Sequence, residues 1–498
     1  MTFFITYNLL PLMIVVIPFY CLYKYTSVPP KRILLIIIII AAAINLRHFF
    51  LFGACTGFDS QEFIGYGQEF ASGNGLTGVI YRTPLYPFIC GLFFSLFSYP
   101  LSALVIFNHL LIILSIIIVW KLALSTGFSL TCATFAAVFF LLNSLVLNMA
   151  QYIMSDLLFM FLLLISLLSA VLFIKQAPSM KMALITAILF ALTLHCRQLS
   201  APFAYTTILI SFLRAFQNRC KKRFLVTAVF ALVYFVSIVP WSLHNYKTHG
   251  YYGLSSHFGA NIFTKLTSYN LQDTTSPTMQ KIRPVYDNVL FDLGLTGYET
   301  PEYPESDWTI NIIPHTLTDS LTINHGMQYH EASDLLKRAS FEGFAADPSA
   351  YLNSVAKTFF SLLFKHHELY PSPKRVWPQS LSPALLPASF FRGFFYLPGH
   401  FIFLFIPLFL FYKKKSFYML IPFTAIGTGY LMTSLVQTGF TRYTIPWIPY
   451  WAILAGFCID KGIDTGTIII RKFKPHIKNH LSKPGTLVRK SASKQDTP

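Results

Sequence analysis

The stretch ILLIIIIIAAAINLRHFFLF, residues Ile33 to Phe52, decides the fold, because Arg47 is its one Lys, Arg, Asp or Glu. An α-helix needs about 20 apolar residues to cross the hydrocarbon of a bilayer. Lipid offers the backbone no other hydrogen-bond partner, so such a run must be helical. Comparable runs recur at Leu101 to Trp120, Met154 to Ile174, Phe224 to Leu243, Phe394 to Tyr412 and Phe417 to Gln437. The sequence therefore predicts a polytopic membrane protein.

Composition and three ambiguous stretches refine the number of spans. Apolar residues make up 54% of the chain and charged residues 12%, a mix typical of membrane proteins and not of soluble ones. Ile5 to Tyr23 lacks the marks of a signal peptide and is predicted to span. Met182 to Leu213 is flanked by basic loops on both sides, so it is predicted to cross twice or to dip and return, with Arg197 at an external crest. Leu85 to Tyr99 is short enough for an interfacial helix. We expect an all-α polytopic fold of about eleven transmembrane helices with a mixed external domain.

The net charge of +18 is explained by membrane topology. Of the 38 basic residues, 23 fall in one set of segments, which includes the Arg214 to Arg223 loop, the Lys413 to Lys415 triplet and the tail after Lys461. The positive-inside rule makes this set cytoplasmic. This assignment leaves no basic surface for nucleic acid, and it predicts an external N-terminus and a cytoplasmic C-terminal tail.

The chain divides into four predicted regions. They are an N-terminal transmembrane module over residues 1–243 with a first external loop at 53–100, an external domain at 244–393, C-terminal transmembrane helices at 394–460 and a basic tail at 461–498. None of the 7 cysteines lies in the external domain, so neither a disulfide framework nor a zinc site is predicted.

Asp59 begins the most informative loop, FDSQEFIGYGQEFASGNG, which runs from Phe58 to Gly75. The segment from Ser60 to Ala71 favours a short juxtamembrane helix that Gly73 and Gly75 end. A carboxylate just past the outer end of a span could act on a substrate held at the lipid interface. The competing interpretation is structural: Asp59 could be the N-cap of this helix.

Further candidates are ionisable residues near the outer interface. Asp156 stands at the outer start of a span, where its structural alternative is an N-cap or a partner of Arg47 or Arg197. Arg82, Arg197, Arg442 and, part-way along a span, Arg47 could hold a phosphate through their planar, permanently charged guanidinium groups, although such arginines can also snorkel toward lipid headgroups.

Histidines and a lysine mark the entrance to the external domain. His244, Lys247 and His257 could touch a phosphate or an acceptor. No Asp-x-Asp or His-Glu-x-x-His pattern occurs, and the His325 and His330 pair is more typical of a solvated loop than of a metal site. No metal is predicted.

Five pieces of the sequence, in order, resemble the GT-C glycosyltransferases, and most of all the branch that holds the protein O-mannosyltransferases and the bacterial aminoarabinose transferases of lipid A (family 39-like). The first is Asp59 with its helix and the Arg-x-Pro-Leu-Tyr-Pro run from Arg82 to Pro87. The others are MSDLLFMFLLL (154–164), LTLHCRQLSAPF (192–203), HNYKTHGYYGLSSHFGANIF (244–263) and GFTRYTIPWIPYWAILAG (439–456). The external domain's interior and the tail carry no resemblance.

The resemblance implies a reaction and its partners. A sugar on a polyprenyl phosphate would pass, with inversion, to a glycan, lipid or protein acceptor at the outer face of a bacterial inner membrane, for example in modification of lipopolysaccharide. It implies Asp59 as base with Asp156 beside it, and Arg82, Arg197, Arg442, Lys247 and His244 around the donor phosphate. No cofactor is implied, because the lipid-linked sugar is a substrate.

Three other classes stay open at this point. An O-antigen polymerase or ligase would share the spans, the large external loop and the lipid-linked substrates. A transporter of lipid-linked sugars would place ionisable residues near the bilayer midplane, whereas here they lie at the outer ends of the spans. A non-catalytic membrane scaffold is the third.

Overall fold

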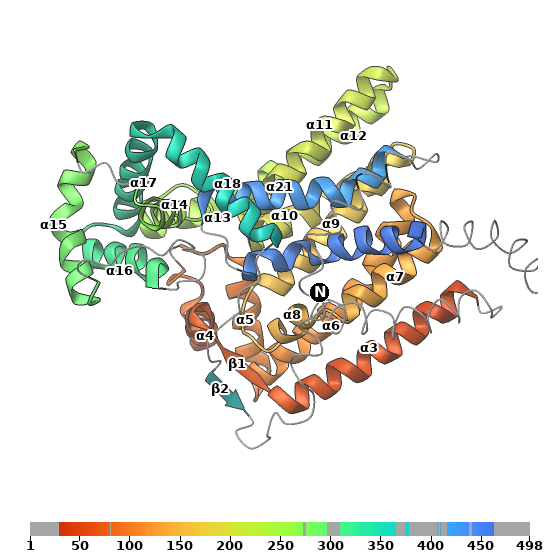
Figure 1. Cartoon of the computed structure of the whole chain (residues 1–498), viewed down its shortest axis with the longest axis horizontal. Helices are drawn as coiled ribbons and strands as arrows, with labels where there is room; N and C mark the ends of the chain where they lie inside the picture. Colours follow the sequence, from red (N-terminus) through yellow and green to blue (C-terminus); the bar gives the residue numbers. More distant parts are fainter. Residues whose placement is uncertain are drawn as a thin grey trace, which may run out of the picture.

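The computed structural model describes residues 29–79, 81–271, 275–295, 309–364, 374–377, 406, 409, 416–437 and 441–462. Nearly all of its regular structure is helical (Figure 1). The long apolar stretches contain α3 (Pro30–Phe52), α6 (Pro100–Thr126), α9 (Asp156–Lys175), α11 (Ala201–Gln217), the consecutive pair α12 (Lys221–Val236) and α13 (Ile238–His249), and α21 (Ile421–Val436) with the 3₁₀ helix η6 (Phe417–Leu420) before it. Shorter apolar helices are α5 (Leu85–Leu96), α7 (Leu130–Leu141) and α10 (Met180–Cys196). The short helix α8 (Ser144–Met149) lies between α7 and α9.

Within the described residues, 6 helical stretches are long and apolar enough to cross a membrane. The stretch of α9 is 78% buried by other helices, whereas that of α3 is only 22% buried. A helix that is apolar on all sides but leaves side chains such as Leu35, Ile39 and Leu46 exposed requires an apolar solvent on that side. Thus α9 lies at the centre of a bundle, and α3 lies at its edge and faces lipid.

Two of the three ambiguous stretches, Met182 to Leu213 and Leu85 to Tyr99, lie within the described residues. Helices α10 and α11 form a hairpin, and Arg197 lies in the turn between them, as the sequence predicted. Leu85 to Tyr99 forms the 12-residue helix α5, which is too short to span a bilayer. Helices α12 and α13 together make one apolar stretch that continues to His249, so the predicted domain boundary after residue 243 falls inside α13.

Polar contacts join the apolar helices at few but buried points. Ser166 and Ser169 of α9 bond to threonines of α10 at 2.8 and 2.7 Å, and small residues of this kind allow helices to pack closely in lipid. Arg223 donates to the carbonyl groups of Phe173, Ile174 and Gln176 at the end of α9. Cations stabilise the negative end of a helix dipole, so this basic loop fastens the hairpin of α11 and α12 to the bundle.

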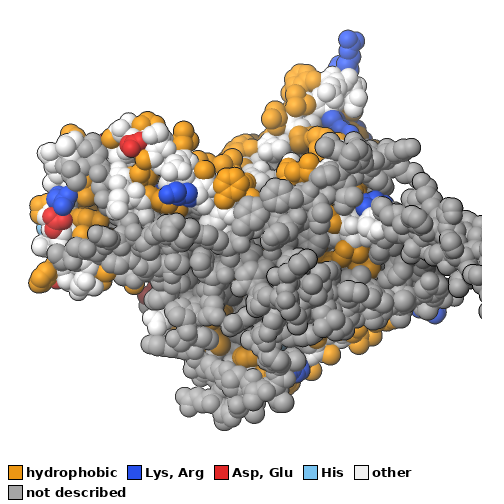
Figure 2. Space-filling view, viewed as in Figure 1, with side chains coloured by type: hydrophobic (Ala, Val, Ile, Leu, Met, Phe, Trp, Pro, Cys, Tyr) orange, Lys and Arg blue, Asp and Glu red, His pale blue; other side chains and the backbone are white. Residues whose placement is uncertain are grey.

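The same hairpin projects from the bundle in Figure 1, and its surface fits the predicted topology. Figure 2 shows apolar side chains along its stem and basic side chains at its tip. The sequence around the turn between the two helices contains Arg219, Lys221 and Lys222. A basic tip on an apolar stem is the arrangement that the positive-inside rule predicts for a cytoplasmic loop.

A second hydrophobic core lies outside the bundle. It is built by α14 (Phe258–Ser268), α15 (Pro277–Asp292), α16 (Thr309–Ile323) and α17 (Tyr329–Ala346), with α18 (Pro348–Phe364) leading back toward α21. In Figure 1 these helices gather at one end of the molecule. A Cβ on Gly259 would lie 1.7 Å from the Ser333 carbonyl oxygen, so only glycine allows α14 and α17 to approach this closely.

The first external loop joins the bundle to this second unit. Strand β1 (Ala54–Thr56) pairs antiparallel with β2 (Lys374–Trp377), with Cys55 opposite Arg375. Helix α4 (Phe58–Glu69) and the π-turn η2 (Phe70–Asn74) follow. Gly73 and Gly75 have positive φ angles of 93° and 66°, which explains why glycines end this helix.

The prediction of an all-α polytopic membrane protein is confirmed by these helices. The total of eleven spans stays a prediction, because Ile5 to Tyr23, Phe394 to Tyr412 and most of the basic tail lie outside the described residues. In the described part of the predicted external domain, β2 is the one strand beside the helices α14 to α18.

Candidate active site

Helix α4 follows α3 and β1 and carries Asp59 at the end of the bundle where His257 and His315 of the second unit lie. Its N-cap is Gly57, whose backbone N–H donates to the Ser60 hydroxyl at 2.9 Å. Asp59 therefore lies inside the first turn and is not the capping residue, contrary to the structural alternative. With the cap supplied by its neighbours, the Asp59 carboxylate is available for other contacts.

Two arginines from distant parts of the sequence hold the Asp59 carboxylate, one on each oxygen. Arg442 Nη1 donates to Oδ2 at 2.7 Å, and Arg82 Nη2 donates to Oδ1 at 3.2 Å. The side chains are 14% (Asp59), 12% (Arg442) and 19% (Arg82) exposed. Arg82 precedes α5, and Arg442 lies in the 3₁₀ helix η7 (Thr441–Trp447). We call these three residues the Asp59 centre.

Glu62 is attached to this centre and was not predicted. Its Oε2 accepts from Arg82 Nε at 2.9 Å, and its side chain is 28% exposed. Glu62 follows Asp59 by three positions in α4, which puts both carboxylates on one face of the helix. The two arginines and two carboxylates are therefore balanced in charge.

The electrostatics of the centre follow from this pairing. Burial acts to raise the pKa of Asp59, but the positive charges of Arg442 and Arg82 outweigh it and hold that pKa well below its usual range. Burial acts to lower the pKa of Arg82, and the charges of Asp59 and Glu62 reverse this effect. Asp59 is thus ionised at every physiological pH while its arginines remain in contact.

A second ion pair lies at the start of α9. Arg197 Nη2 donates to Asp156 Oδ2 at 2.7 Å, and Arg197 Nε donates to the Ser155 hydroxyl at 3.1 Å. The Asp156 side chain is fully buried, and its Oδ1 has no hydrogen-bond partner among the described residues. Of the structural alternatives for Asp156, the partnership with Arg197 is the one observed.

The two ion pairs are neighbours. The Thr83 hydroxyl, next to Arg82, donates to the Cys196 carbonyl, next to Arg197, at 2.7 Å. The positive charge of Arg197 also contributes to the lowered pKa of Asp59. Five of the predicted site residues thus form two neighbouring groups, Asp59 with Arg82 and Arg442, and Asp156 with Arg197.

The external domain faces the Asp59 centre with His257, His315 and Tyr329, and Tyr81 of the first loop lies between them and Arg82. His257 Nδ1 is 2.8 Å from the Tyr329 hydroxyl, and its ring lies 4.9 Å from that of His315. Tyr329 stacks on Tyr81 at 5.0 Å, and the Tyr81 ring lies 5.5 Å from Arg82 Cζ. Burial and the charge of Arg82 lower the pKa of His315 to about 4, so its imidazole is neutral at pH 7. For His257, burial and the neighbouring His315 lower the pKa as well.

Other predicted residues stand apart from these contacts. His244 lies on α13 and stacks on Trp241 with 4.7 Å between ring centroids. Lys247, also on α13, and Arg47, on α3, are exposed. Among the described residues, no group of three or more His, Cys, Asp or Glu side chains could hold a metal ion.

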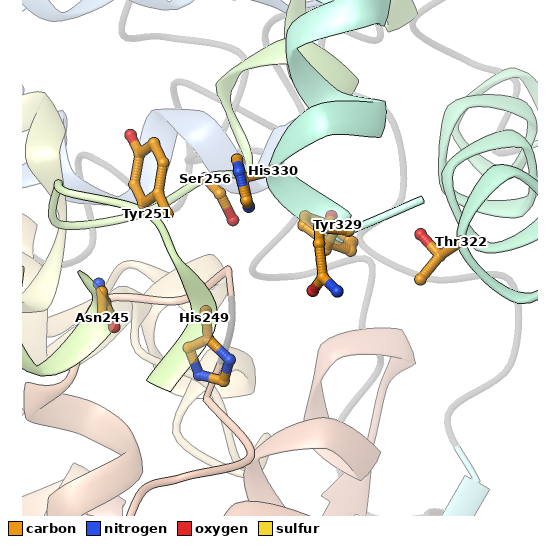
Figure 3. A pocket seen from close by; sticks show the side chains of 8 residues that line it. Asn245, His249, Tyr251, Ser256, Thr322, Tyr329 and His330 are labelled. Carbon is orange, nitrogen blue, oxygen red and sulfur yellow. The ribbon is translucent and has the colours of Figure 1, made fainter. Parts of the chain in front are cut away.

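A small pocket lies beside the aromatic side chains, between α13, α16 and α17 (Figure 3). It offers about 80 Å³ of free space. Asn245, His249, Thr322, Tyr329 and His330 are among the side chains that line it. The described lining includes none of the residues that the sequence proposed for the phosphate or the acceptor, which are Asp59, Arg82, Asp156, Arg197, His244, Lys247, His257 and Arg442.

Sequence reasoning missed Glu62, Tyr81, His315 and Tyr329. The spacing of Glu62 from Asp59 and the adjacency of Tyr81 to Arg82 were available signals. His315 and Tyr329 lie more than two hundred positions from Arg82 in the external domain, and no local pattern marks such a contact.

Part of the chain is similar to a known protein family. A family model described as dolichyl-phosphate-mannose-protein mannosyltransferase matches residues 81–242. This range begins at Tyr81 beside Arg82 and includes Asp156 and Arg197. The resemblance to the GT-C glycosyltransferases that the sequence predicted is therefore confirmed over this part of the chain. Among curated proteins there is no match.

Two solved structures are similar to the chain. Both are of ArnT from Cupriavidus metallidurans, one in the apo state and one bound to undecaprenyl phosphate. The apo form is 10% identical with a TM-score of 0.34, covering 84% of this chain and 76% of that one. The bound form is 11% identical with a TM-score of 0.34, covering 88% and 80%.

Proposed function

We propose that the protein is a membrane glycosyltransferase that moves a sugar from a polyprenyl phosphate to an acceptor hydroxyl, with inversion, at the outer face of a bacterial inner membrane. The family model over residues 81–242 supports the reaction class. The observation that carries the proposal is the Asp59 centre, where one carboxylate and two arginines meet from three distant segments. A base and a pair of phosphate-binding cations are what this transfer needs at one place.

The donor phosphate binds Arg82 and Arg442. Arginine pairs with phosphate through two parallel hydrogen bonds, which lysine cannot reproduce. Because the centre is balanced in charge, the phosphate must displace a carboxylate. Glu62 is the more exposed of the two, so it leaves Arg82 at the lower cost. As the sugar departs, negative charge grows on the phosphate and the arginines bind it more strongly.

Asp59 acts as the base, and donor binding prepares it. While both arginines contact it, the low pKa of Asp59 makes it a weak proton acceptor. A bound phosphate neutralises part of their charge, which raises that pKa toward its usual range. The acceptor oxygen then forms a bond to the anomeric carbon of the sugar. The bond from that carbon to the phosphate oxygen breaks, and its electron pair stays on the leaving phosphate. The acceptor proton passes to Asp59.

The remaining predicted residues keep supporting roles in this proposal. Arg197 adds positive charge next to the centre and is oriented by Asp156. Lys247 and His244 lie on α13 and are proposed to meet the donor headgroup as it arrives from the outer leaflet. The activated sugar comes with its lipid, so the step uses no cofactor.

The test is reconstitution of the purified protein in nanodiscs with a series of polyprenyl-phosphate donors. Hexose, pentose and amino-sugar donors are each combined with glycolipid, polysaccharide and peptide acceptors, and products are identified by mass spectrometry. The double variant Arg82→Ala with Arg442→Ala controls for contaminating transferases. Donor consumption in the wild type alone supports the proposal. No consumption with any donor, or equal consumption by the double variant, would overturn it.

A further inference from the structure

The pocket in Figure 3 has features of a binding site that the proposed reaction does not yet use. It lies between the end of α13, the end of α16 and the start of α17. The figure shows Asn245 and His249 of α13 across the space from Thr322 of α16 and Tyr329 of α17. The pocket therefore lies where the bundle meets the external domain.

Two buried polar atoms at this pocket lack a hydrogen-bond partner among the described residues. They are Asn245 Oδ1 and His249 Nε2. Asn245 is only 1% exposed, and its Nδ2 donates to the Gly253 carbonyl at 2.6 Å, which fixes the amide and presents its oxygen. Leaving a buried polar atom without a partner is costly. A ligand or a water must supply the missing bonds.

The lining defines the chemistry of that ligand. No Asp, Glu, Lys or Arg side chain is among the described residues around the pocket, so nothing there selects a charged group. Asn245 Oδ1 can accept a hydrogen bond, and so can the Thr322 hydroxyl, which already donates to the Thr318 carbonyl at 2.8 Å. The imidazole nitrogens donate or accept according to their tautomer. The aromatic ring of Tyr251 lies 5.9 Å from the His330 ring and gives an apolar surface. This combination fits an uncharged group that carries several hydroxyls.

The pocket is also connected to the Asp59 centre through two stacked tyrosines, Tyr329 and Tyr81. Tyr329 lines the pocket, stacks on Tyr81 and bonds to His257, and the Tyr81 ring lies against Arg82. A group in the pocket is therefore separated from the arginines by stacked aromatic rings. The reacting hydroxyl of an acceptor must therefore lie on another part of the molecule, which passes these rings to reach the Asp59 centre.

We infer that this pocket is an acceptor subsite that holds an uncharged, hydroxyl-rich group, such as part of a sugar ring. The inference rests on the proposed transferase function. About 80 Å³ is the volume of roughly two to three waters, which suits one edge of a ring and not a whole oligosaccharide. The rest of the acceptor extends out past Gln328, which is exposed.

The experiment separates acceptor use from donor chemistry. Thr322→Trp fills the pocket, and Ile323→Trp is its matched control, because Ile323 is the next residue and is 79% exposed. For each variant, transfer to a glycan acceptor and release of free sugar to water are both measured. We expect Thr322→Trp to lower kcat/KM for the acceptor by about tenfold or more, with hydrolysis of the donor within twofold of the control.

His249→Phe is a second variant that keeps the fold intact. It removes the unpaired buried nitrogen but also the hydrogen bond between the imidazole and the Thr77 backbone, so the change in thermal stability should be small. Acceptor KM should nevertheless rise. Equal acceptor kinetics in Thr322→Trp and Ile323→Trp would show that the pocket holds only water. An equal loss of transfer and hydrolysis would also contradict an acceptor role.

Direct binding keeps this inference distinct from the proposed function. Saturation-transfer NMR with neutral mono- and disaccharides as probes needs no turnover. Binding by the wild type that Thr322→Trp abolishes and Ile323→Trp preserves would support the subsite even if no donor were consumed. If neither the wild type nor the control binds any of these sugars, the subsite is wrong, whatever reaction the Asp59 centre performs.

Discussion

The carboxylates of Asp59 and Asp156 differ in how they are paired with arginines. Asp59 has one arginine on each oxygen and keeps 14% of its side chain exposed. Asp156 has a single arginine, is fully enclosed and has one oxygen without a partner among the described residues. Arg82 also pairs with a second carboxylate, that of Glu62. Among the described residues, Arg197 pairs with the carboxylate of Asp156 alone.

From this difference we expect Asp59 to have a catalytic role and Asp156 a structural one. The Asp59 centre can exchange a partner, since Glu62 is partly exposed and a phosphate can replace it on Arg82. The Asp156 pair has no such exchange, because removing either partner would leave a buried charge uncompensated. We therefore expect substitutions at Asp59 to change transfer and substitutions at Asp156 to change stability.

The largest expected effect is on transfer by Asp59→Asn. The amide keeps the size and some of the hydrogen bonds to Arg82 and Arg442 but cannot take the acceptor proton. General base catalysis contributes about 10² to 10⁴ in rate, so kcat should fall by this factor. Asp287→Asn, which disrupts the exposed pair with Arg283, is the control and should leave kcat unchanged. A kcat within a few-fold of the wild type would remove the base role from Asp59.

Next in size is the cost of Asp156→Asn to the folded state. Breaking a buried ion pair by removing one partner typically costs about 3–5 kcal/mol. Asp59→Asn should cost less, because Arg82 retains Glu62. Thermal denaturation of both variants in the same detergent compares the two costs. If Asp156→Asn proves as stable as the wild type but inactive, the comparison fails and Asp156 belongs to the catalytic residues, as the sequence predicted.

Arg442 offers a finer test of the Asp59 centre. Arg442→Ala should lower kcat by about 10² to 10³, the usual loss when one charge-stabilising donor is removed. Arg442→Lys keeps the charge without the planar fork and should lose less. The loss should appear in kcat and not only in the donor KM, because the phosphate charge grows during transfer. Equal activity of the Lys and Ala variants would assign Arg442 to lipid headgroups instead.

Much of this molecule could be predicted from sequence because lipid imposes strict local rules. Runs such as Ile33 to Phe52 must be helical, and the turn at Arg197 followed from the basic segments on either side of it. Within the site, Asp59, Arg82 and Arg442 were singled out through motifs that resemble a known family. Their binding roles are still predictions, but the structure brings the three side chains together.

The rest depended on contacts that leave no local pattern. Glu62 shares its helix face with Asp59, yet only the position of Arg82 shows that it has a partner. His315 and Tyr329 reach the Asp59 centre because α16 and α17 pack on α14, and such packing between distant segments has no sequence period. Lys247 was expected near the phosphate from its motif, whereas the structure leaves it exposed on α13.

The smallest expected effect is a change in how stability depends on pH, and it comes from His315. The pKa of His315 is lowered to about 4 by burial and by Arg82, and His257, Asp59 and Arg442 are its other charged or titratable neighbours. The unfolded chain, with a histidine pKa near 6.5, therefore binds more protons between pH 6.5 and 4. Stability must fall as pH drops through this window, by at most about 3 kcal/mol for this residue.

His315→Gln should make the decline in melting temperature from pH 7.5 to pH 4.5 shallower, while His257, whose pKa is also lowered, leaves a decline of the same sign. His325→Gln, at an exposed position in the turn after α16, is the matched control and should follow the wild type. The stability that Asp59 gains from its lowered pKa is lost only below its ordinary value near 4, so it does not obscure this window. Parallel curves for the wild type and His315→Gln would mean that His315 is not held neutral beside the Asp59 centre.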